Sequence, residues 1–185
     1  MSYEIRDHRL SGVRYCPSPF ADERPADAQP ELVVVHGISL PPGEFGGPHV
    51  EELFLGQLDP AAHPYFAEIL GLEVSSHVFI RRDGEVTQFV SFDRRAWHAG
   101  ASNWCGRERC NDFSIGIELE GTDDQVYTPA QYEVLADIMN ALLAAYPALQ
   151  EDAITGHCDI APGRKTDPGP FFDWLLLKKM IAARG

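Results

Sequence analysis

Apolar residues form short runs separated by turns rich in Gly and Pro, a pattern typical of strands mixed with helices. Residues 31–36 (ELVVVH) are rich in β-branched side chains and predict a buried strand that ends at His36. Residues 76–90 (SHVFIRRDGEVTQFV) predict a hairpin, because the central Asp-Gly pair supplies the positive φ of a tight turn. Residues 113–120 (FSIGIELE) alternate between apolar and polar or small residues and predict another strand.

The strongest helix signal covers residues 128–146. Thr128 can act as the N-cap, a Pro follows at the first helical position, and Gln131 completes a capping box. Apolar residues then recur at helical spacing until Pro147 ends the helix. The remaining patterns predict short helices at 49–55 and 65–70, a short extended segment at 153–156 and a last helix at about 172–183.

These elements predict an α/β fold in which a central mixed β-sheet is flanked by helices. The chain has 185 residues, enough for one domain with a sizeable core, so we assign residues 1–185 to a single domain. Residues 1–31 are polar and rich in Pro, and we expect an irregular N-terminal arm packed on that domain.

Composition narrows the range of partners. The net charge is −13, which disfavours binding to nucleic acid and to anionic membrane surfaces. No apolar run approaches the roughly 18 residues of a membrane span, and the first residues lack the apolar region of a signal peptide. We therefore expect a cytoplasmic protein with no obligate protein partner.

The four cysteines are expected to be free thiols, as is usual in a reducing compartment. They are Cys16, Cys105, Cys110 and Cys158. Cys105 and Cys110 are close enough in sequence to suggest a metal or redox pair, but they lack the C-x-x-C spacing of such motifs.

Candidate chemistry lies at the ends of the predicted strands. His36 ends one strand, and His157 follows the short extended segment. Asp167 comes later in a loop crowded with Pro and Gly, residues 155–170, to which neither helix nor strand fits well. Two His and one carboxylate form a common catalytic zinc set whose fourth position stays open for water.

Two further residues could complete a hydrolytic site. Glu118, inside a predicted strand, could shuttle protons, and Lys165 could stabilise an oxyanion. The structural alternatives are a surface role for Glu118, capped loop histidines, and a turn-forming Asp before Pro. Against a surface role, Ser114 and Gly116 share the face of Glu118 and leave space for a cleft beside it.

Three stretches carry a family resemblance: RAWHAG (95–100), GRERCNDFSIGIELEG (106–121) and GHCDIAPGRKTDPG (156–169). With the regions around them they closely resemble the 1,6-anhydro-N-acetylmuramyl-L-alanine amidases of the AmpD type, over about residues 12–175. That family belongs to the zinc amidase group, which includes T7-type lysozyme and the peptidoglycan recognition proteins.

The resemblance implies a zinc amidase fold with Zn²⁺ as its only cofactor. It implies hydrolysis of the amide between the lactyl group of 1,6-anhydro-N-acetylmuramic acid and L-alanine of the stem peptide. The implied setting is cytosolic recycling of cell-wall peptidoglycan, which in some bacteria also keeps a β-lactamase regulator quiet.

The resemblance also implies roles for individual residues. His36, His157 and Asp167 would bind zinc, Glu118 would be the general base and acid, and Lys165 would stabilise the oxyanion. The substrate, a small anhydro-muropeptide, would be bound by four residues. These are Arg109, which would hold a stem-peptide carboxylate, and Trp97, His98 and Ala161, which would contact sugar or peptide.

Three positions leave questions about substrate preference. Gly37 and Glu73 stand where relatives are expected to have Asn and Arg. His77 matches a strand histidine whose role could be structural. Two other classes of function also stay open: a muropeptide-binding module without catalysis, and a structural metal protein in which Cys158 closes the zinc shell.

Overall fold

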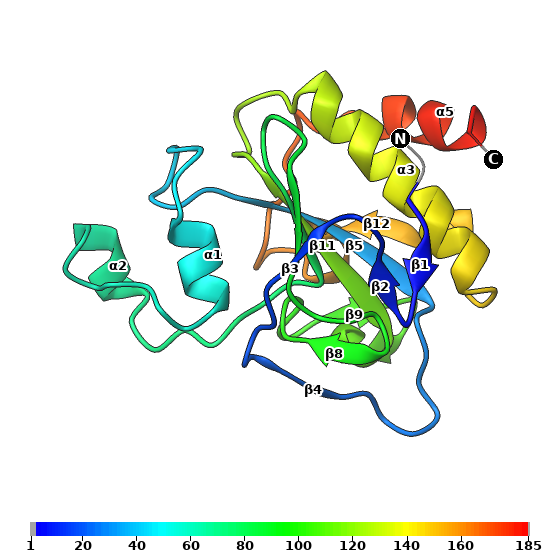
Figure 1. The fold of residues 1–185 in the computed structure, drawn as a ribbon, viewed down its shortest axis with the longest axis horizontal. Coiled ribbons are helices and arrows are strands. Elements are labelled where there is room, and N and C mark those ends of the chain that lie inside the picture. The colour runs from blue at the N-terminus through cyan, green and yellow to red at the C-terminus, as the bar shows by residue number, and fades with distance from the viewer. Residues whose placement is uncertain (1–2, 185) are drawn as a thin grey trace.

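The computed structural model describes residues 3–184, which are built around a six-stranded mixed β-sheet (Figure 1). Its strand order is β12 (Ile154–Gly156), β5 (Leu32–Ile38), β11 (Ser114–Glu120), β6 (Val78–Ile80), β7 (Val86–Gln88) and β3 (Arg14–Tyr15). The first four of these strands are parallel, β7 is antiparallel to β6, and β3 is parallel to β7. The predicted mixed sheet flanked by helices is confirmed.

The other elements surround this sheet. The helices are α1 (His49–Phe54), α2 (Pro64–Glu68), α3 (Pro129–Ala145), α4 (His157–Ile160) and α5 (Trp174–Ala182), with 3-10 turns η1 (Cys110–Asp112) and η2 (Glu151–Ala153). Small two-stranded ladders pair β1 (Ile5–Arg6) with β2 (Arg9–Leu10), β4 (Ala21–Glu23) with β8 (Arg94–Ala96), and β9 (Asn103–Trp104) with β10 (Arg107–Glu108).

One face of the sheet packs against α3 and α5, which lie side by side in Figure 1. Val33 and Val35 of β5 and Ile117 of β11 join Leu135 and Met139 of α3 in one buried cluster. The predicted capping box of α3 is present. The Thr128 hydroxyl accepts from the backbone N–H of Gln131, and the Gln131 side chain accepts from the backbone N–H of Thr128. These contacts leave the opposite face of β5 and β11 to carry polar side chains.

The opposite face is covered by smaller elements and loops. Phe54 of α1 and Phe66 of α2 pack with Phe79 of β6 in a second buried cluster. The predicted hairpin is confirmed as the antiparallel pair β6–β7, and its Gly84 has the required positive φ of 88°. All seven residues of β11 are buried, so neither face of this strand meets open solvent.

The N-terminal arm is more regular than the sequence predicted. It contains β1 to β4, and β3 forms an edge of the central sheet. The arm is anchored by Arg24, whose guanidinium donates to the backbone carbonyls of Phe92, Asp112 and Ser114. Strand pairing and buried hydrogen bonds with distant segments, invisible in the local sequence, order parts of an arm that the sequence predicted to be irregular.

The extended segment predicted at 153–156 is present as β12. The loop that follows differs from its prediction, because one helical turn, α4, begins at His157. Asp159 stabilises that turn, because its carboxylate accepts from the backbone N–H of Gly156 and from the Thr155 hydroxyl. This side-chain capping supplies hydrogen bonds that the Pro- and Gly-rich composition alone did not predict.

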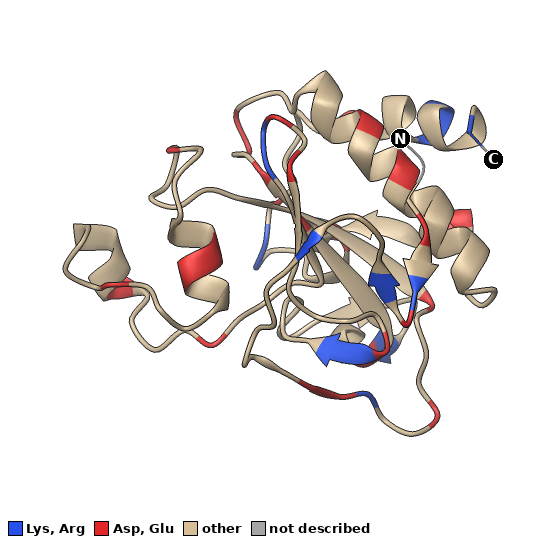
Figure 2. Cartoon of the chain, in the orientation of Figure 1, with Lys and Arg blue, Asp and Glu red and all other residues tan. Residues whose placement is uncertain are grey.

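Acidic and basic residues are distributed unevenly over the elements (Figure 2). Acidic residues, in red, mark α1, α3 and several loops, while β8 stands out in blue with Arg94 and Arg95. No helix within residues 3–184 is long and apolar enough to cross a membrane. The four cysteines are all free thiols, as predicted.

Candidate active site

The register of the parallel strands brings the first functional side chains together. His36 of β5 lies directly opposite Glu118 of β11, and Gly156 of β12 lies opposite Val35. His157, the next residue after β12, therefore arrives beside His36. All three strands end at the same edge of the sheet, which is where parallel α/β proteins place their ligands.

Asp167 completes a compact three-residue cluster. Its Oδ2 lies 3.2 Å from His36 Nδ1 and 3.1 Å from His157 Nδ1, and the two Nδ1 atoms are 2.9 Å apart. Among residues 3–184, this is the one group of His, Cys, Asp and Glu with a geometry that could hold a metal ion. The structure thus unites the three predicted metal ligands.

The loop that carries Asp167 is held by hydrogen bonds to the carbonyls of Asp167 and Pro168. The backbone N–H of Cys158 donates to the Asp167 carbonyl over 2.9 Å, which ties the loop to α4. The buried hydroxyl of Tyr127 donates to the Pro168 carbonyl, also over 2.9 Å. The aspartate is therefore positioned by backbone contacts rather than by a metal alone.

The outer nitrogens of both histidines indicate what the cluster can bind. His157 Nε2 lies 3.2 Å from the Ala99 carbonyl, which can only accept, so the ring proton belongs on Nε2. His36 Nε2 contacts His98 Nδ1 at 2.9 Å, and His98 Nε2 contacts the Ser114 hydroxyl at 3.1 Å. A proton on the Nε2 of each ring satisfies all three contacts.

This proton arrangement points the Nδ1 lone pairs of His36 and His157 toward the Asp167 carboxylate. Three electron-rich atoms at such short separations repel one another unless a cation lies between them. Two imidazole nitrogens and one carboxylate oxygen are ligands that zinc prefers, and they leave a fourth position for water or substrate. The residues present therefore fit the zinc ion that the sequence predicted.

The pKa shifts of the same residues favour metal binding. Burial lowers the pKa of His36 to about 4, so its imidazole is neutral near pH 7. The net shift in the pKa of Asp167 is downward despite its burial, so its carboxylate is ionised near pH 7. A neutral imidazole and an ionised carboxylate are the protonation states that a metal requires.

Glu118 lies beside this cluster without belonging to it. Its Oε1 is 3.8 Å from His36 Nδ1, and its buried Oε2 has no hydrogen-bond partner among residues 3–184. Burial, followed by the charge of Asp167, raises the pKa of Glu118 well above its ordinary value. A carboxyl group that readily holds a proton next to a metal-binding cluster can act as a general acid and base.

A cavity of about 560 Å³ opens over the cluster. Its polar floor contains His36, Glu118, His157 and Asp167, and Lys165 lies on its wall. Apolar side chains form much of the remaining wall: Leu40, Leu53, Phe54, Tyr65 and Ile69. A cavity of this size, apolar but with a few converging polar groups, suits a small-molecule ligand.

Comparison with known proteins decides the family. Residues 26–170 match the family model described as N-acetylmuramoyl-L-alanine amidase. The chain belongs to the N-acetylmuramoyl-L-alanine amidase family. It is an amide hydrolase, as its sequence predicted.

Individual relatives agree with this assignment. The amidase is 63% identical over 173 residues to the 1,6-anhydro-N-acetylmuramyl-L-alanine amidase AmpD of Salmonella typhimurium SL1344, covering 94% of this chain and 92% of the relative. A crystal structure of a selenomethionine AmpD derivative matches with a TM-score of 0.93 at 60% identity, covering 96% and 98% of the two chains.

A more distant solved structure contains a bound muropeptide. It is the complex of the amidase AmiD from Escherichia coli with anhydro-N-acetylmuramic acid-L-Ala-D-γ-Glu-L-Lys. Its TM-score is 0.60 at 26% identity, and the match covers 97% of this chain and 65% of AmiD.

The predicted substrate-binding residues are divided between two locations. Trp97 and His98 line the cavity of this amidase, but His98 is 8% exposed and its ring nitrogens face His36 and Ser114. Arg109 and Ala161 are not among the residues that line the cavity. Arg109 is exposed and pairs with Asp112, and the Ala161 carbonyl accepts backbone hydrogen bonds within its own turn.

The structure also shows the surroundings of Gly37, Glu73 and His77, the three positions that raised questions about substrate preference. Gly37 lines the cavity, and a Cβ there would lie 2.3 Å from the Tyr127 hydroxyl. Glu73 also lines the cavity. His77 is structural: its Nδ1 accepts from the backbone N–H of Gly116, and its Nε2 contacts the Arg94 carbonyl.

Two residues near the site were missed by sequence reasoning. Tyr127, which anchors the Asp167 loop, was not considered as a site residue. Asn111 lines the cavity and lies within the GRERCND stretch, in which the sequence predicted Arg109 as the substrate-binding residue. Its contacts with the loop before β9 depend on tertiary structure, although its place inside the family-like stretch 106–121 was an available signal.

Proposed function

We propose that this amidase binds one zinc ion through His36, His157 and Asp167. With that ion it would hydrolyse the amide between the lactyl group of 1,6-anhydro-N-acetylmuramic acid and L-alanine of the stem peptide. The observation that carries the proposal is the convergence of two Nδ1 atoms and one carboxylate oxygen within 3.2 Å of one another at the floor of the cavity. The substrate follows from the 63% identity to an AmpD enzyme over nearly the full length of both chains.

The protein groups around the cluster divide the work of hydrolysis. When bound, zinc would polarise the scissile carbonyl and make water a stronger nucleophile near neutral pH. Glu118 would accept a proton from the attacking water as the new C–O bond forms. It would then give that proton to the L-alanine nitrogen as the C–N bond breaks.

Lys165 would stabilise the negative charge that develops on the carbonyl oxygen. It lies on the wall of the same cavity as Glu118 and the three metal-binding residues. Its backbone N–H donates to Ala161 over 3.0 Å, which limits the movement of the chain that carries the ammonium group. A preorganised charge of this kind is typically the largest contribution to catalysis in acyl transfer.

The proposed setting is the cytoplasm, in the recycling of peptidoglycan fragments. Four unpaired cysteines support this location, because thiols persist in reducing compartments. By removing muropeptides, the enzyme would also lower the signal that induces β-lactamase in hosts with such a regulator. The expected partner is the small-molecule substrate, in keeping with the bound muropeptide of the AmiD complex.

One experiment tests zinc and activity together. The purified protein is assayed for metal content and incubated with anhydro-muropeptide, with and without a chelator, while mass spectrometry follows the products. We expect one zinc per chain and chelator-sensitive release of stem peptide and anhydro-N-acetylmuramic acid. Bound zinc without cleavage would favour the muropeptide-binding module, and a folded protein without zinc would overturn the proposed metal site.

A further inference from the structure

We propose that Asn111 is a positioning residue that holds the outer hydrogen-bond partners of both metal-binding histidines. The inference rests on the proposed zinc site, and it concerns a side chain that belongs to none of the roles described above. Asn111 is the middle residue of η1, which directly precedes β11.

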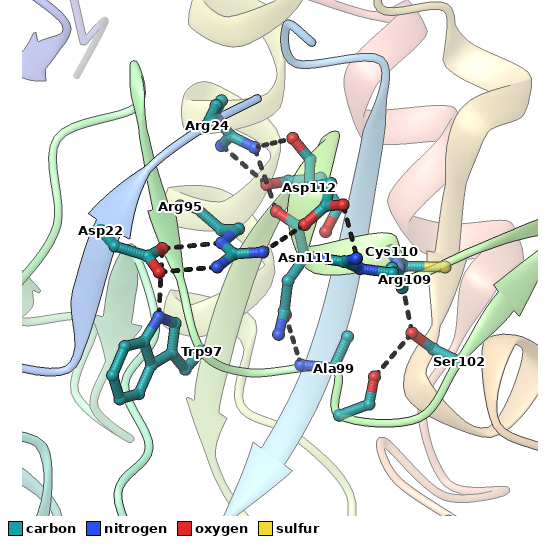
Figure 3. Close-up of polar contacts among 12 residues, drawn as sticks. Asp22, Arg24, Arg95, Trp97, Ala99, Ser102, Arg109, Cys110, Asn111 and Asp112 are labelled. Carbon is teal, nitrogen blue, oxygen red and sulfur yellow. Dashed lines mark hydrogen bonds and ion pairs between the residues drawn. The ribbon is translucent and has the colours of Figure 1, made fainter. Parts of the chain in front are cut away.

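The amide oxygen of Asn111 accepts two consecutive backbone donors. Its Oδ1 lies 3.1 Å from the N–H of His98 and 2.8 Å from the N–H of Ala99. Figure 3 shows the side chain of Asn111 directed at Ala99, with the latter contact dashed. One oxygen therefore fixes the backbone of both residues at once.

Those two residues are the partners of the two metal-binding rings. His98 contacts His36 Nε2 through its own Nδ1 at 2.9 Å, and the Ala99 carbonyl accepts from His157 Nε2 at 3.2 Å. Outer partners of this kind set which nitrogen of a histidine carries the proton and how the ring is oriented. Both histidines are thus connected through one intermediate residue each to the same amide oxygen.

The backbone around Asn111 is itself held in place. Arg24 donates to the carbonyls of Asn111 and Asp112 at 3.2 and 3.0 Å. The carboxylate of Asp112 pairs with Arg95, which also binds Asp22 (Figure 3). This network connects the N-terminal arm and β8 to η1, so the amide of Asn111 projects from a rigid frame.

Packing gives the His98 ring little freedom to compensate for a displaced backbone. A Cβ placed on Gly116 would lie 2.4 Å from His98 Cγ, which means that the ring fills the space next to that glycine. The room that Ser114 and Gly116 leave beside Glu118 is therefore occupied by His98. A shift of the His98 backbone would move the ring relative to His36 rather than be absorbed by an empty space.

A competing role would be direct contact with substrate, because Asn111 also lines the cavity. The two roles predict different measurements. Loss of a positioning residue weakens zinc binding and lowers kcat, whereas loss of a substrate contact raises KM and leaves zinc affinity unchanged.

The test uses matched variants of the full-length protein. Asn111→Leu removes the acceptor at similar volume, Asn111→Ser shortens it without adding apolar bulk, and Asn111→Asp keeps an oxygen at the same position. The control is Asn140→Leu, the same substitution on α3. Asn140 donates to the carbonyls of Ala136 and Ile181 and is not among the residues that line the cavity. Zinc dissociation constants are measured by competition with a chromogenic chelator, and thermal unfolding of each metal-free variant is recorded.

We expect Asn111→Leu and Asn111→Ser to bind zinc about 10- to 100-fold more weakly than the wild type, the range found for outer partners of metal ligands. Asn111→Asp should restore most of this affinity, and Asn140→Leu should lower thermal stability without changing zinc affinity. In the zinc-loaded protein, the His157 Nε2 proton should exchange faster with water in Asn111→Leu, as seen by NMR.

Two outcomes would overturn the inference while leaving the zinc site intact. One is wild-type zinc affinity in both Asn111→Leu and Asn111→Ser. The other is a raised KM as their only defect. Failure of the wild-type protein to bind zinc would instead refute the proposed function, so the two failures are distinguishable.

Discussion

At the scale of single residues, the clearest feature is a group of four buried histidines with different roles. His36 and His157 belong to the cluster that could hold a metal ion. His98 contacts the outer nitrogen of His36, and His77 holds the backbone of β11. The sequence singled out His36 because it ends a strand. His98 was predicted to contact substrate, and only the structure shows its ring against His36, since that contact joins residues 62 positions apart.

Variants of the proposed metal ligand and of the proposed oxyanion stabiliser should differ in zinc content. Asp167→Ala removes one of three ligands, so we expect it to lose zinc and activity together. Lys165→Ala leaves the cluster intact and should retain zinc while turnover falls by about 100- to 1,000-fold. Metal analysis of the purified variants, combined with the muropeptide assay, checks both. Normal zinc content and cleavage in both variants would refute the assignments.

Glu118 is predicted to act on protons rather than on the metal. Glu118→Gln keeps the shape of the side chain but cannot exchange a proton, so kcat should fall by about a hundred- to ten-thousand-fold with zinc content unchanged. Glu120→Gln, two residues along the same face, is not a neutral control, because its carboxylate accepts from the backbone N–H groups of Gly46 and Arg82. The better control is Glu133→Gln on α3. Substantial turnover in Glu118→Gln would exclude it as the proton shuttle.

At the scale of elements, the site depends on how the strands and one loop are joined. β11 shows the advantage of alternation: Ile115, Ile117 and Leu119 pack toward α3, while Glu118 faces the cavity. The Asp167 loop is connected to the start of α3 through Tyr127, which donates to Pro168. This hydrogen bond therefore couples the position of the Asp167 loop to that of the predicted helix α3.

Tyr127→Phe tests this coupling. Losing the hydroxyl leaves the buried Pro168 carbonyl without its partner, which should lower the free energy of unfolding by about 1–3 kcal/mol. Zinc affinity should fall as well, because the same loop positions Asp167. Tyr146→Phe is the matched control: its hydroxyl contacts an exposed His8, and we expect a change below about 0.5 kcal/mol. Denaturant unfolding and chelator competition measure both effects, and equal behaviour of the two variants would contradict the coupling.

At the scale of the whole molecule, neutral histidines buried in the folded state link stability to pH. Burial lowers the pKa of His36 to about 4, and burial with the charge of Arg24 lowers that of His77 to about 3. In the unfolded chain both would return to the ordinary value of 6.5. Below that value the unfolded state binds more protons than the folded state, so acid favours unfolding.

We therefore expect the metal-free protein to lose stability as the pH falls from about 6.5 toward 4. The slope should approach about 1.4 kcal/mol per pH unit for each buried histidine once the pH is well below 6.5. Denaturant unfolding at a series of pH values, in the presence of a chelator, measures this slope. Between pH 7 and 8 the buried histidines should contribute almost nothing to the slope of unfolding free energy against pH, so this range provides an internal control. Glu118 acts in the opposite direction, because its raised pKa makes the folded state bind a proton first as the pH falls. The profile is therefore also measured for Glu118→Gln, and a flat profile of that variant from pH 7 to 5 would show that the histidines are not held neutral.

The sequence by itself determined most of the fold and the identity of the central site residues. Local patterns are sufficient for β5, β11, the β6–β7 hairpin and α3, because apolar alternation, an Asp-Gly turn and a capping box act between near neighbours. Family-like stretches, rather than spacing, identified the set of site residues. Their type was readable because metal binding and proton transfer require particular side chains.

Tertiary structure alone decided how those residues are held. Arg24 joins the N-terminal arm to the carbonyl of Phe92, and Asn111 accepts from the backbone N–H groups of His98 and Ala99, which contact the two proposed metal ligands. Arg109 and Ala161 fit a family pattern, yet neither lines the cavity. The physical reason is common to these cases: backbone hydrogen bonds and close packing between distant segments leave no periodic trace in the chain, whereas the propensities that build each element do.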